Sequence, residues 1–190
     1  ARAANAKVTD VTAINGGVSF MVAANALPWV LPDEAAEGVA LAKVGQRLSN
    51  EKLIVHGLAP GKYALKIDGA EVGEWTATQL ARGISLEGNA KTPQYQQAKK
   101  VALLNKERND KVYQKIRGQY SALKGTRRKL DQDVKGNDPE IEKKKALFEE
   151  WHGKMKKTVA GLMAEAKALE DQIYTANQPV PRKYEVTPVK

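Results

Sequence analysis

The chain has 190 residues, of which 42% are hydrophobic, enough for a modest core in one domain or two small ones. It contains no cysteine, which excludes disulfides, thiolate metal sites and a cysteine nucleophile. Residues 1–90 hold 8 Lys and Arg against 9 Asp and Glu, a net charge of −1, and residues 91–190 hold 23 against 13, a net charge of +10. All of the basic excess therefore lies in the second half.

The first residues lack the apolar centre of a signal peptide, and no run of about 18 apolar residues occurs anywhere in the chain. We therefore expect a soluble protein without a membrane span. The chain begins with Ala1 rather than Met, and we expect it to be a piece of a longer protein.

The N-terminal segment shows strand patterning. Two β-rich runs, 7–14 and 18–24, are joined by Asn15-Gly16-Gly17, and an Asn-Gly connection supplies the positive φ angles of a tight hairpin. A stretch at 32–48 follows with apolar residues at helical spacing, which predicts one crossing helix.

A second pair of β-rich runs, 52–56 and 63–67, flanks Ala59-Pro60-Gly61, where Pro and Gly favour a turn. This pattern predicts a second hairpin. Asp68-Gly69 then turns the chain toward a further run at 72–75. Residues 1–90 are therefore expected to be a small β-rich accessory domain with one helix.

The second half changes to a helical period. Thr92-Pro93 and Asp138-Pro139 each resemble an N-cap followed by Pro at the first helical position. The second helix carries a continuous apolar stripe, formed by Phe148, Trp151, Met155, Val159, Leu162, Ala166, Leu169 and Ile173. The inner face of the first is less regular and comprises Tyr95, Ala98, Ala102, Val112, Ile116, Tyr120 and Leu123.

A short connection near 131–137 forces the two helices to be antiparallel. The predicted fold class is α+β: a small antiparallel β unit with one helix, then a long basic helical hairpin at 91–175, then an extended tail containing Pro at 176–190. Because two helices bury only a narrow seam, we expect a further surface to cover the aromatic side chains of the hairpin.

No catalytic constellation is evident. The two histidines, His56 and His152, lie in different halves without an evident partner, and no zinc-binding spacing is present. No serine lies in a Gly-x-Ser-x-Gly elbow; the serines considered are Ser19, Ser49, Ser85 and Ser121. We predict no complete catalytic site, no cofactor and no metal site.

Three further patterns have simple structural explanations. Gly57 to Tyr63 resembles a phosphate-binding loop, but it has three residues between its glycines and Tyr where Ser or Thr must bind magnesium, so we interpret it as a hairpin turn. Adjacent acids on a helix point to different sides, so Glu149-Glu150 and Glu170-Asp171 are interpreted as solvated surface. Trp29 and Trp75 could stack on a sugar, but we predict core positions for them.

The basic clusters 127–129, 143–145 and 154–157 have the local cation density that binding to phosphates needs. Helix dipoles offer another explanation, because the first cluster is expected near a helix C-terminus and acids open the next helix. Few aromatic residues are interleaved for base stacking. A solvated or domain-docking face is therefore favoured over nucleic acid or another acidic polymer.

Several runs resemble the C-terminal region of bacterial hydrolases of the SGNH/GDSL type. The similar segments are Leu27-Pro28-Trp29-Val30-Leu31-Pro32, residues 53–69, Val72-Gly73, Gly83-Ile84-Ser85-Leu86 and residues 91–98. In that family the nucleophilic Ser lies in a Gly-Asp-Ser block near the N-terminus, and an Asp-x-x-His block comes late in the catalytic domain. Neither block is present here, since Leu53 and Glu149 stand three residues before the histidines.

The resemblance implies that this chain is a non-catalytic C-terminal portion of a serine esterase acting on acyl or carbohydrate esters, and that its partner is a catalytic domain preceding Ala1. It also favours a secreted or periplasmic location. Two alternatives stay open: a free-standing module that binds a polyanion or nucleic acid through its basic hairpin, and a structural assembly subunit that self-associates through the stripe from Phe148 to Ile173.

Overall fold

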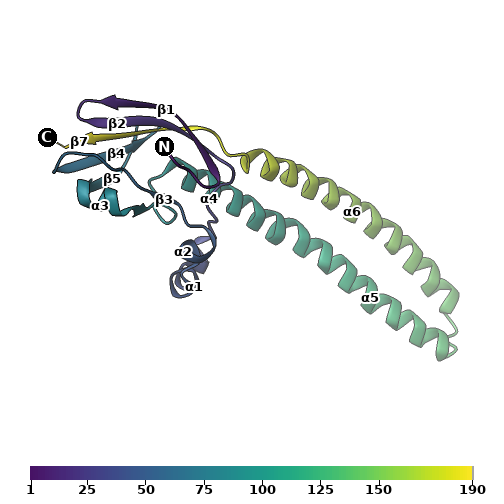
Figure 1. Cartoon of the computed structure of the whole chain (residues 1–190). Helices are drawn as coiled ribbons and strands as arrows, with labels where there is room; N and C mark the ends of the chain where they lie inside the picture. The colour runs from purple at the N-terminus through teal and green to yellow at the C-terminus, as the bar shows by residue number, and fades with distance from the viewer. Residues whose placement is uncertain (190) are drawn as a thin grey trace. The chain divides into compact units, whose positions relative to one another are not determined.

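The chain forms two compact units. The computed structural model describes residues 1–189, with the side chain of Gln46 left aside. The sheet unit comprises Ala1–Leu103 and Tyr174–Lys190, and the hairpin unit comprises Leu104–Ile173. The predicted α+β fold class is confirmed, because a five-stranded antiparallel sheet is combined with two long antiparallel helices (Figure 1).

The five-stranded sheet has the strand order β1-β2-β7-β4-β5. Its members are β1 (Ala6–Ile14), β2 (Gly17–Ala24), β4 (Lys62–Ile67), β5 (Ala70–Thr76) and β7 (Arg182–Pro188). The last strand of the chain therefore lies in the middle, antiparallel to β2 on one side and to β4 on the other. The predicted extended tail is indeed extended, and its backbone hydrogen bonds complete the sheet.

Two hairpins have the turn geometry that their sequences indicate. Asn15 and Gly16 have φ angles of 45° and 76°, and Asp68 and Gly69 have 52° and 81°. Positive φ at both central residues is the geometry whose twist matches that of flanking strands. The β1–β2 hairpin and the turn between β4 and β5 are thus confirmed.

The predicted hairpin between residues 52–56 and 63–67 is wrong. The strand β3 is only two residues long (Lys52–Leu53) and pairs with β6 (Ile84–Ser85) in a separate two-stranded sheet. The physical reason is that β4 has a partner on both edges, β5 on one and β7 on the other. Residues 57–63 were interpreted as a hairpin turn; instead, residues 57–61 form a loop and residues 62–63 begin β4.

The core of the sheet unit covers one face of the sheet. Alternation along β4 buries every second side chain, and β7 adds two more. The buried residues of this core are Phe20, Tyr63, Leu65, Ile67, Val72, Leu80, Ile84, Leu86, Tyr184 and Val186. Phe20 and Tyr184 stack across neighbouring strands with 5.4 Å between ring centroids. Trp75 packs against this core as predicted, whereas Trp29 is 52% exposed, contrary to the prediction.

The helices before residue 93 differ from the prediction in two ways. The expected single helix at 32–48 is broken into η1 (Asp33–Ala35), α1 (Ala36–Ala42) and α2 (Val44–Leu48), because Lys43 takes the left-handed conformation between them. A further helix, α3 (Ala77–Arg82), was not predicted. Its signal is present in the sequence, since Thr76 and Gln79 form a reciprocal capping box.

Helical turns continue from Pro93 to Lys135 through α4 (Pro93–Glu107), the π-helical η2 (Arg108–Tyr113) and α5 (Gln114–Lys135). Thr92 caps the start as predicted, its hydroxyl accepting from the amide of Tyr95 at 3.3 Å. After a connection at residues 136–140, α6 (Ile141–Ala176) returns antiparallel to α5. Asp138 accepts from the amide of Glu140 at 2.8 Å, which satisfies one of the free amides at the helix start.

The hairpin unit has a narrow seam. Val112, Ile116 and Ala166 are buried there, with Tyr113, Leu162 and Leu169 packed against them. The predicted stripe on α6 is confirmed, since all of its residues are buried or half-buried. Tyr120, expected on the inner face of the first helix, is exposed instead.

Candidate functional site

The serines and histidines considered in the sequence do not come together. His56 is exposed in the loop after β3, and His152 lies on α6, 5.5 Å from Phe148 between ring centroids. The hydroxyl of Ser49 accepts a hydrogen bond from the amide of Trp29 at 2.7 Å. Within residues 1–189, neither histidine has a hydrogen-bond or ion-pair partner.

The adjacent acids on α6 make ordinary surface ion pairs. Glu150 accepts from Lys154 at 2.6 Å, and Asp171 accepts from Lys167 at 2.7 Å. Glu170 lies 3.5 Å from Arg108 within the hairpin unit. Among the described residues, no group of three or more His, Cys, Asp or Glu could hold a metal ion.

A buried polar cluster in the sheet unit is the most distinctive chemical feature of the structure. We call Glu51, Glu87, Gln94 and Tyr184 the buried cluster. The side-chain amide of Gln94 donates to Glu51 Oε1 at 2.6 Å and to the Tyr184 hydroxyl at 3.0 Å. The Tyr184 hydroxyl also donates to Glu51 Oε1 at 3.3 Å.

Four different segments supply these groups. Glu51 precedes β3, Glu87 follows β6, Gln94 lies in the first turn of α4, and Tyr184 lies in β7. The amide of Glu51 also donates to Glu87 Oε2 at 3.3 Å. The buried cluster therefore ties the short sheet, the start of a long helix and the central strand to one another.

Burial changes the acidity of two members. Desolvation raises the pKa of Glu51, and the nearby Glu87 carboxylate adds to this, although hydrogen bonds from Gln94 and Tyr184 oppose it. The pKa of Tyr184 is also raised, first by its burial and then by the adjacent carboxylate. Both shifts favour the neutral form of these two groups.

Two polar atoms of the buried cluster have no hydrogen-bond partner in the described structure, Glu51 Oε2 and Gln94 Oε1. An unpaired buried carboxylate oxygen is costly, and protonation of Glu51 lowers that cost. Chemically, the arrangement favours the protonated form of Glu51 more than water does. It does not present a nucleophile to solvent, because the Tyr184 side chain is buried.

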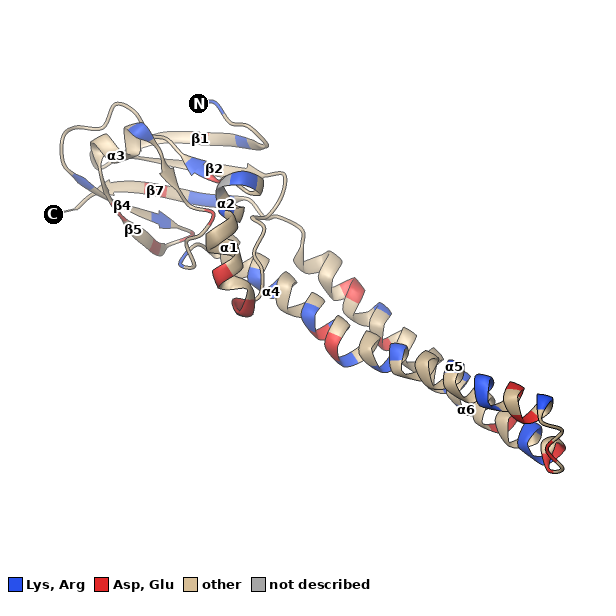
Figure 2. Cartoon of the chain, turned by 90° about the horizontal axis from the view of Figure 1, so that it is seen from below, with Lys and Arg blue, Asp and Glu red and all other residues tan. Residues whose placement is uncertain are grey.

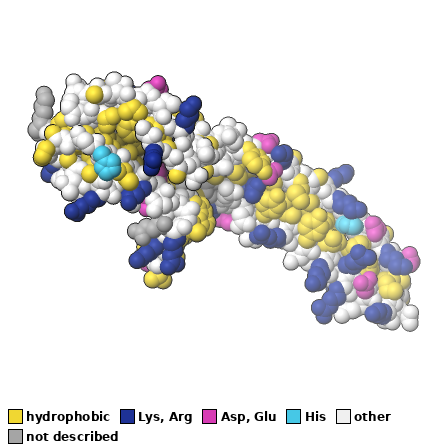
Figure 3. Space-filling model, in the orientation of Figure 1, with side chains coloured by type: hydrophobic (Ala, Val, Ile, Leu, Met, Phe, Trp, Pro, Cys, Tyr) yellow, Lys and Arg dark blue, Asp and Glu magenta, His cyan; other side chains and the backbone are white. Residues whose placement is uncertain are grey.

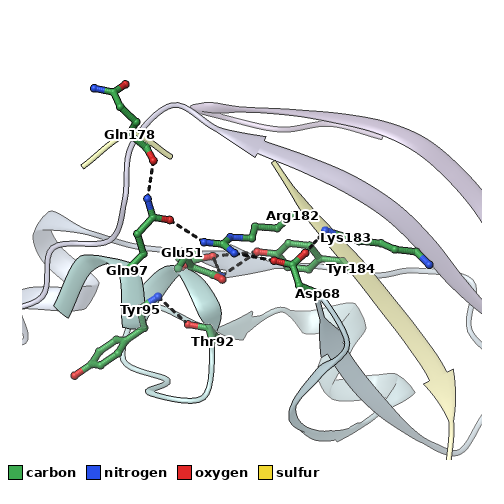
Figure 4. A network of polar contacts seen from close by, with 10 residues as sticks. Glu51, Asp68, Thr92, Tyr95, Gln97, Gln178, Arg182, Lys183 and Tyr184 are labelled. Atoms are coloured by element: carbon green, nitrogen blue, oxygen red, sulfur yellow. Dashed lines mark hydrogen bonds and ion pairs between the residues drawn. The ribbon is translucent and has the colours of Figure 1, made fainter. Parts of the chain in front are cut away.

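A second polar group, the clasp, consists of Asp68, Gln97, Arg182 and their backbone partners (Figure 4). Arg182 donates to Asp68 Oδ2 at 2.8 Å and to Gln97 Oε1 at 2.7 Å. The side-chain amide of Gln97 donates to the carbonyls of Ala176 and Gln178. The clasp thus joins the chain just before the hairpin unit to the chain just after it.

Sequence reasoning missed both groups. Asp68 was identified only as a turn residue, and the Thr92-Pro93 cap placed Gln94 and Gln97 on a helix without indicating their partners. Glu51 and Tyr184 are 133 residues apart in the sequence. No local pattern reports a contact at such separation, so only the fold could reveal it.

The basic clusters lie in long helices of the hairpin unit, as the blue segments of Figure 2 show. The helix α5 continues to Lys135, so residues 127–129 lie about two turns before its end. The dipole acts mainly within the last turn, and therefore it does not explain that cluster. Lys143, Lys144, Lys145 and Lys154 are paired with acids. In the described structure, residues 127–129 and 156–157 have no acidic partner.

No helix within residues 1–189 is long and apolar enough to cross a bilayer. Comparison with known proteins found no family model and no curated protein that matches. A solved structure entitled "BT4096 a gut microbial diltiazem-metabolizing enzyme" is similar, with a TM-score of 0.75 and 28% sequence identity. The match covers 99% of this chain and 47% of that chain. This chain therefore resembles about half of an enzyme.

Proposed function

We propose that this chain is the non-catalytic C-terminal portion of a serine hydrolase of the SGNH/GDSL type, and that it supports a catalytic domain preceding residue 1. The observation that carries the proposal is the match itself, in which nearly the whole chain corresponds to 47% of an enzyme chain. The sequence runs that resemble the C-terminal region of SGNH/GDSL hydrolases also support this proposal.

The geometry also favours a supporting role. The clasp and the buried cluster hold the interior of the sheet unit together, and neither presents a nucleophile and a base to a substrate. On this proposal the catalytic serine, its histidine and the oxyanion-binding groups belong to the other part of the protein. A secreted or periplasmic location belongs to the same proposal.

The same comparison supports a proposal for the substrate class. The name of the similar enzyme states that it metabolises diltiazem, and diltiazem carries an acetyl ester. The serine oxygen of a serine hydrolase would bond to the acyl carbon and the alcohol would leave; water would then cleave the acyl-enzyme, which releases the carboxylic acid and restores the serine. We therefore propose acyl esters as substrates of the whole protein.

The test compares three samples: the 190-residue chain, the full-length protein from the natural gene, and the full-length protein with Ser→Ala in any Gly-Asp-Ser block. p-Nitrophenyl acetate and diltiazem serve as substrates. We expect hydrolysis only by the unaltered full-length protein. The proposal fails if the natural gene encodes nothing beyond this chain, or if the chain alone hydrolyses the esters at the full-length rate.

The unpaired cations of the hairpin favour a second candidate function, binding of a polyanion. Residues 127–129 of α5 and 156–157 of α6 offer five positive charges without acidic partners among the described residues. Such charges would release counterions on binding, so the affinity would fall steeply with salt.

A further inference from the structure

Residues 33–48 of the sheet unit, which form η1, α1 and α2, are called the projecting segment. This segment has apolar side chains that no other part of the described structure fully buries. Figure 1 shows α1 and α2 standing away from the five-stranded sheet. None of the described side chains in these three helices is buried.

Two leucines of the projecting segment are exposed to solvent. Leu41 is 88% exposed and Leu48 is 68% exposed. Trp29 and Ile54, which precede and follow the segment, are also exposed. Hydrophobic side chains are visible on the surface of this region in Figure 3.

Helix propensity does not account for the projecting segment. Its helices have 7 and 5 residues, whereas isolated helices shorter than about 12–15 residues are marginal in water. In proteins, short helices persist because an apolar side packs against other elements. Here that packing is incomplete, since Val39 and Val44 are half-buried while Leu41 and Leu48 are exposed.

Polar contacts nevertheless hold the projecting segment in place. Lys99 Nζ lies 3.0 Å from both carboxylate oxygens of Asp33 at its start. The Trp29 amide donates to Ser49 just beyond its end. Near its middle, a Cβ on Gly45 would lie 2.7 Å from Glu87 Cγ, so the backbone approaches the buried cluster closely. The segment is therefore anchored while Leu41 and Leu48 stay uncovered.

We infer that the projecting segment, with Trp29 and Ile54, is a docking face for the remaining part of the same enzyme. The inference rests on the proposed function and specifies which surface it uses. More than half of the similar enzyme chain lies outside the match, so a second part large enough to cover this face exists in that protein. The occupant is thus an apolar patch on another domain of the same polypeptide.

The test measures amide hydrogen exchange of residues 36–48 in the 190-residue chain and in the full-length protein. Covering the segment suppresses local opening, so we expect exchange at least about tenfold slower in the full-length protein. The double variant Leu41→Asp and Leu48→Asp should remove this protection without changing exchange elsewhere in the sheet unit. Leu147→Asp with Met163→Asp, two exposed positions of the hairpin unit, is the matched control and should leave the protection intact.

The outcomes separate this inference from the proposed function. If the full-length protein contains an active serine hydrolase domain and residues 36–48 exchange equally fast in both samples, the docking face is refuted and the proposed function stands. If no further polypeptide exists, the proposed function fails and the inference fails with it. Protection that rises with the concentration of the 190-residue chain would assign the face to a second copy, which also overturns the inference.

Discussion

The sheet unit and the hairpin unit bury their apolar residues in different ways. The sheet unit surrounds Leu65 and Val186 with side chains from strands that are far apart in sequence. The hairpin unit has a seam between two helices, where a small cluster of Val112, Ile116 and Ala166 is buried. The comparison indicates that stability is concentrated in the sheet unit, and that the hairpin depends on the regularity of its helices.

The same substitution, Leu→Ala, can be made in each unit, and we expect the greatest loss of unfolding free energy when it is made in the sheet unit. Leu65→Ala removes a fully buried side chain and should lower the free energy of unfolding by about 2–5 kcal/mol. Leu162→Ala removes a half-buried side chain from the seam and should cost about 1 kcal/mol. Urea denaturation followed by circular dichroism measures both. Equal losses would show that the two units are packed alike.

The clasp provides the next largest effect, because it fixes β7 at the centre of the sheet. Asp68→Asn weakens an ion pair with Arg182 and should cost about 1–3 kcal/mol of unfolding free energy. Glu185→Gln, which removes a more exposed ion pair with Lys183 on the same strand, serves as the control and should cost less than about 1 kcal/mol. A loss as small as that of the control would mean that the clasp does not stabilise the sheet.

The buried cluster predicts a pH dependence in the sheet unit. The pKa of Glu51 is raised in the folded protein, chiefly by burial. Its contribution to stability is therefore complete below the unfolded pKa, about 4.3, and is lost as the pH rises through the higher folded value. Glu51→Gln removes this loss, so the variant should gain stability relative to the native chain as the pH rises from 4 to 8.

Urea midpoints of both proteins across that pH range measure the effect. Glu150 is the control, because its pKa is lowered by Lys154 and its contribution is lost as the pH falls instead. That loss lies below the unfolded pKa of about 4.3, so between pH 4 and 8 the difference between Glu150→Gln and the native chain should stay nearly constant. A constant difference between the native chain and Glu51→Gln at every pH would contradict the assignment of a raised pKa to Glu51.

Substitutions in the basic part of the hairpin unit should have the smallest effect on stability. They should instead affect the binding of a polyanion. Replacing Arg127, Arg128 and Lys129 by Ala should change the unfolding free energy by less than about 0.5 kcal/mol per site. If the hairpin binds a polyanion, the slope of log affinity for heparin against log salt should become less steep. The control Lys167→Ala removes a charge paired with Asp171 and should leave the slope unchanged. Equal slopes in all three proteins would remove the polyanion candidate.

Local signals predicted the parts of the fold that depend on neighbouring residues. The Asn15-Gly16 and Asp68-Gly69 turns, the caps at Thr92 and Asp138, and the apolar stripe on α6 all have a cause within about one helical turn. The capping box at Thr76 belongs to the same class, although α3 was not predicted.

Contacts between segments that are far apart in the sequence could not be predicted. Residues 52–56 and 63–67 are close in sequence and have a suitable turn, yet β4 pairs with β5 and β7 instead. The buried cluster and the clasp were missed for the same reason, because each combines residues separated by tens of positions or more.

The α+β class, the antiparallel helical hairpin and the unequal charge of the two halves can be read from the sequence, because periodicity and composition act locally. Three features come from the fold alone: the last strand completes the sheet from its centre, the half-buried carboxyl of Glu51 lies beside Tyr184, and Leu41 and Leu48 are uncovered. These features depend on which segments meet in space, and backbone hydrogen bonding and burial select those partners from among many that local patterns allow.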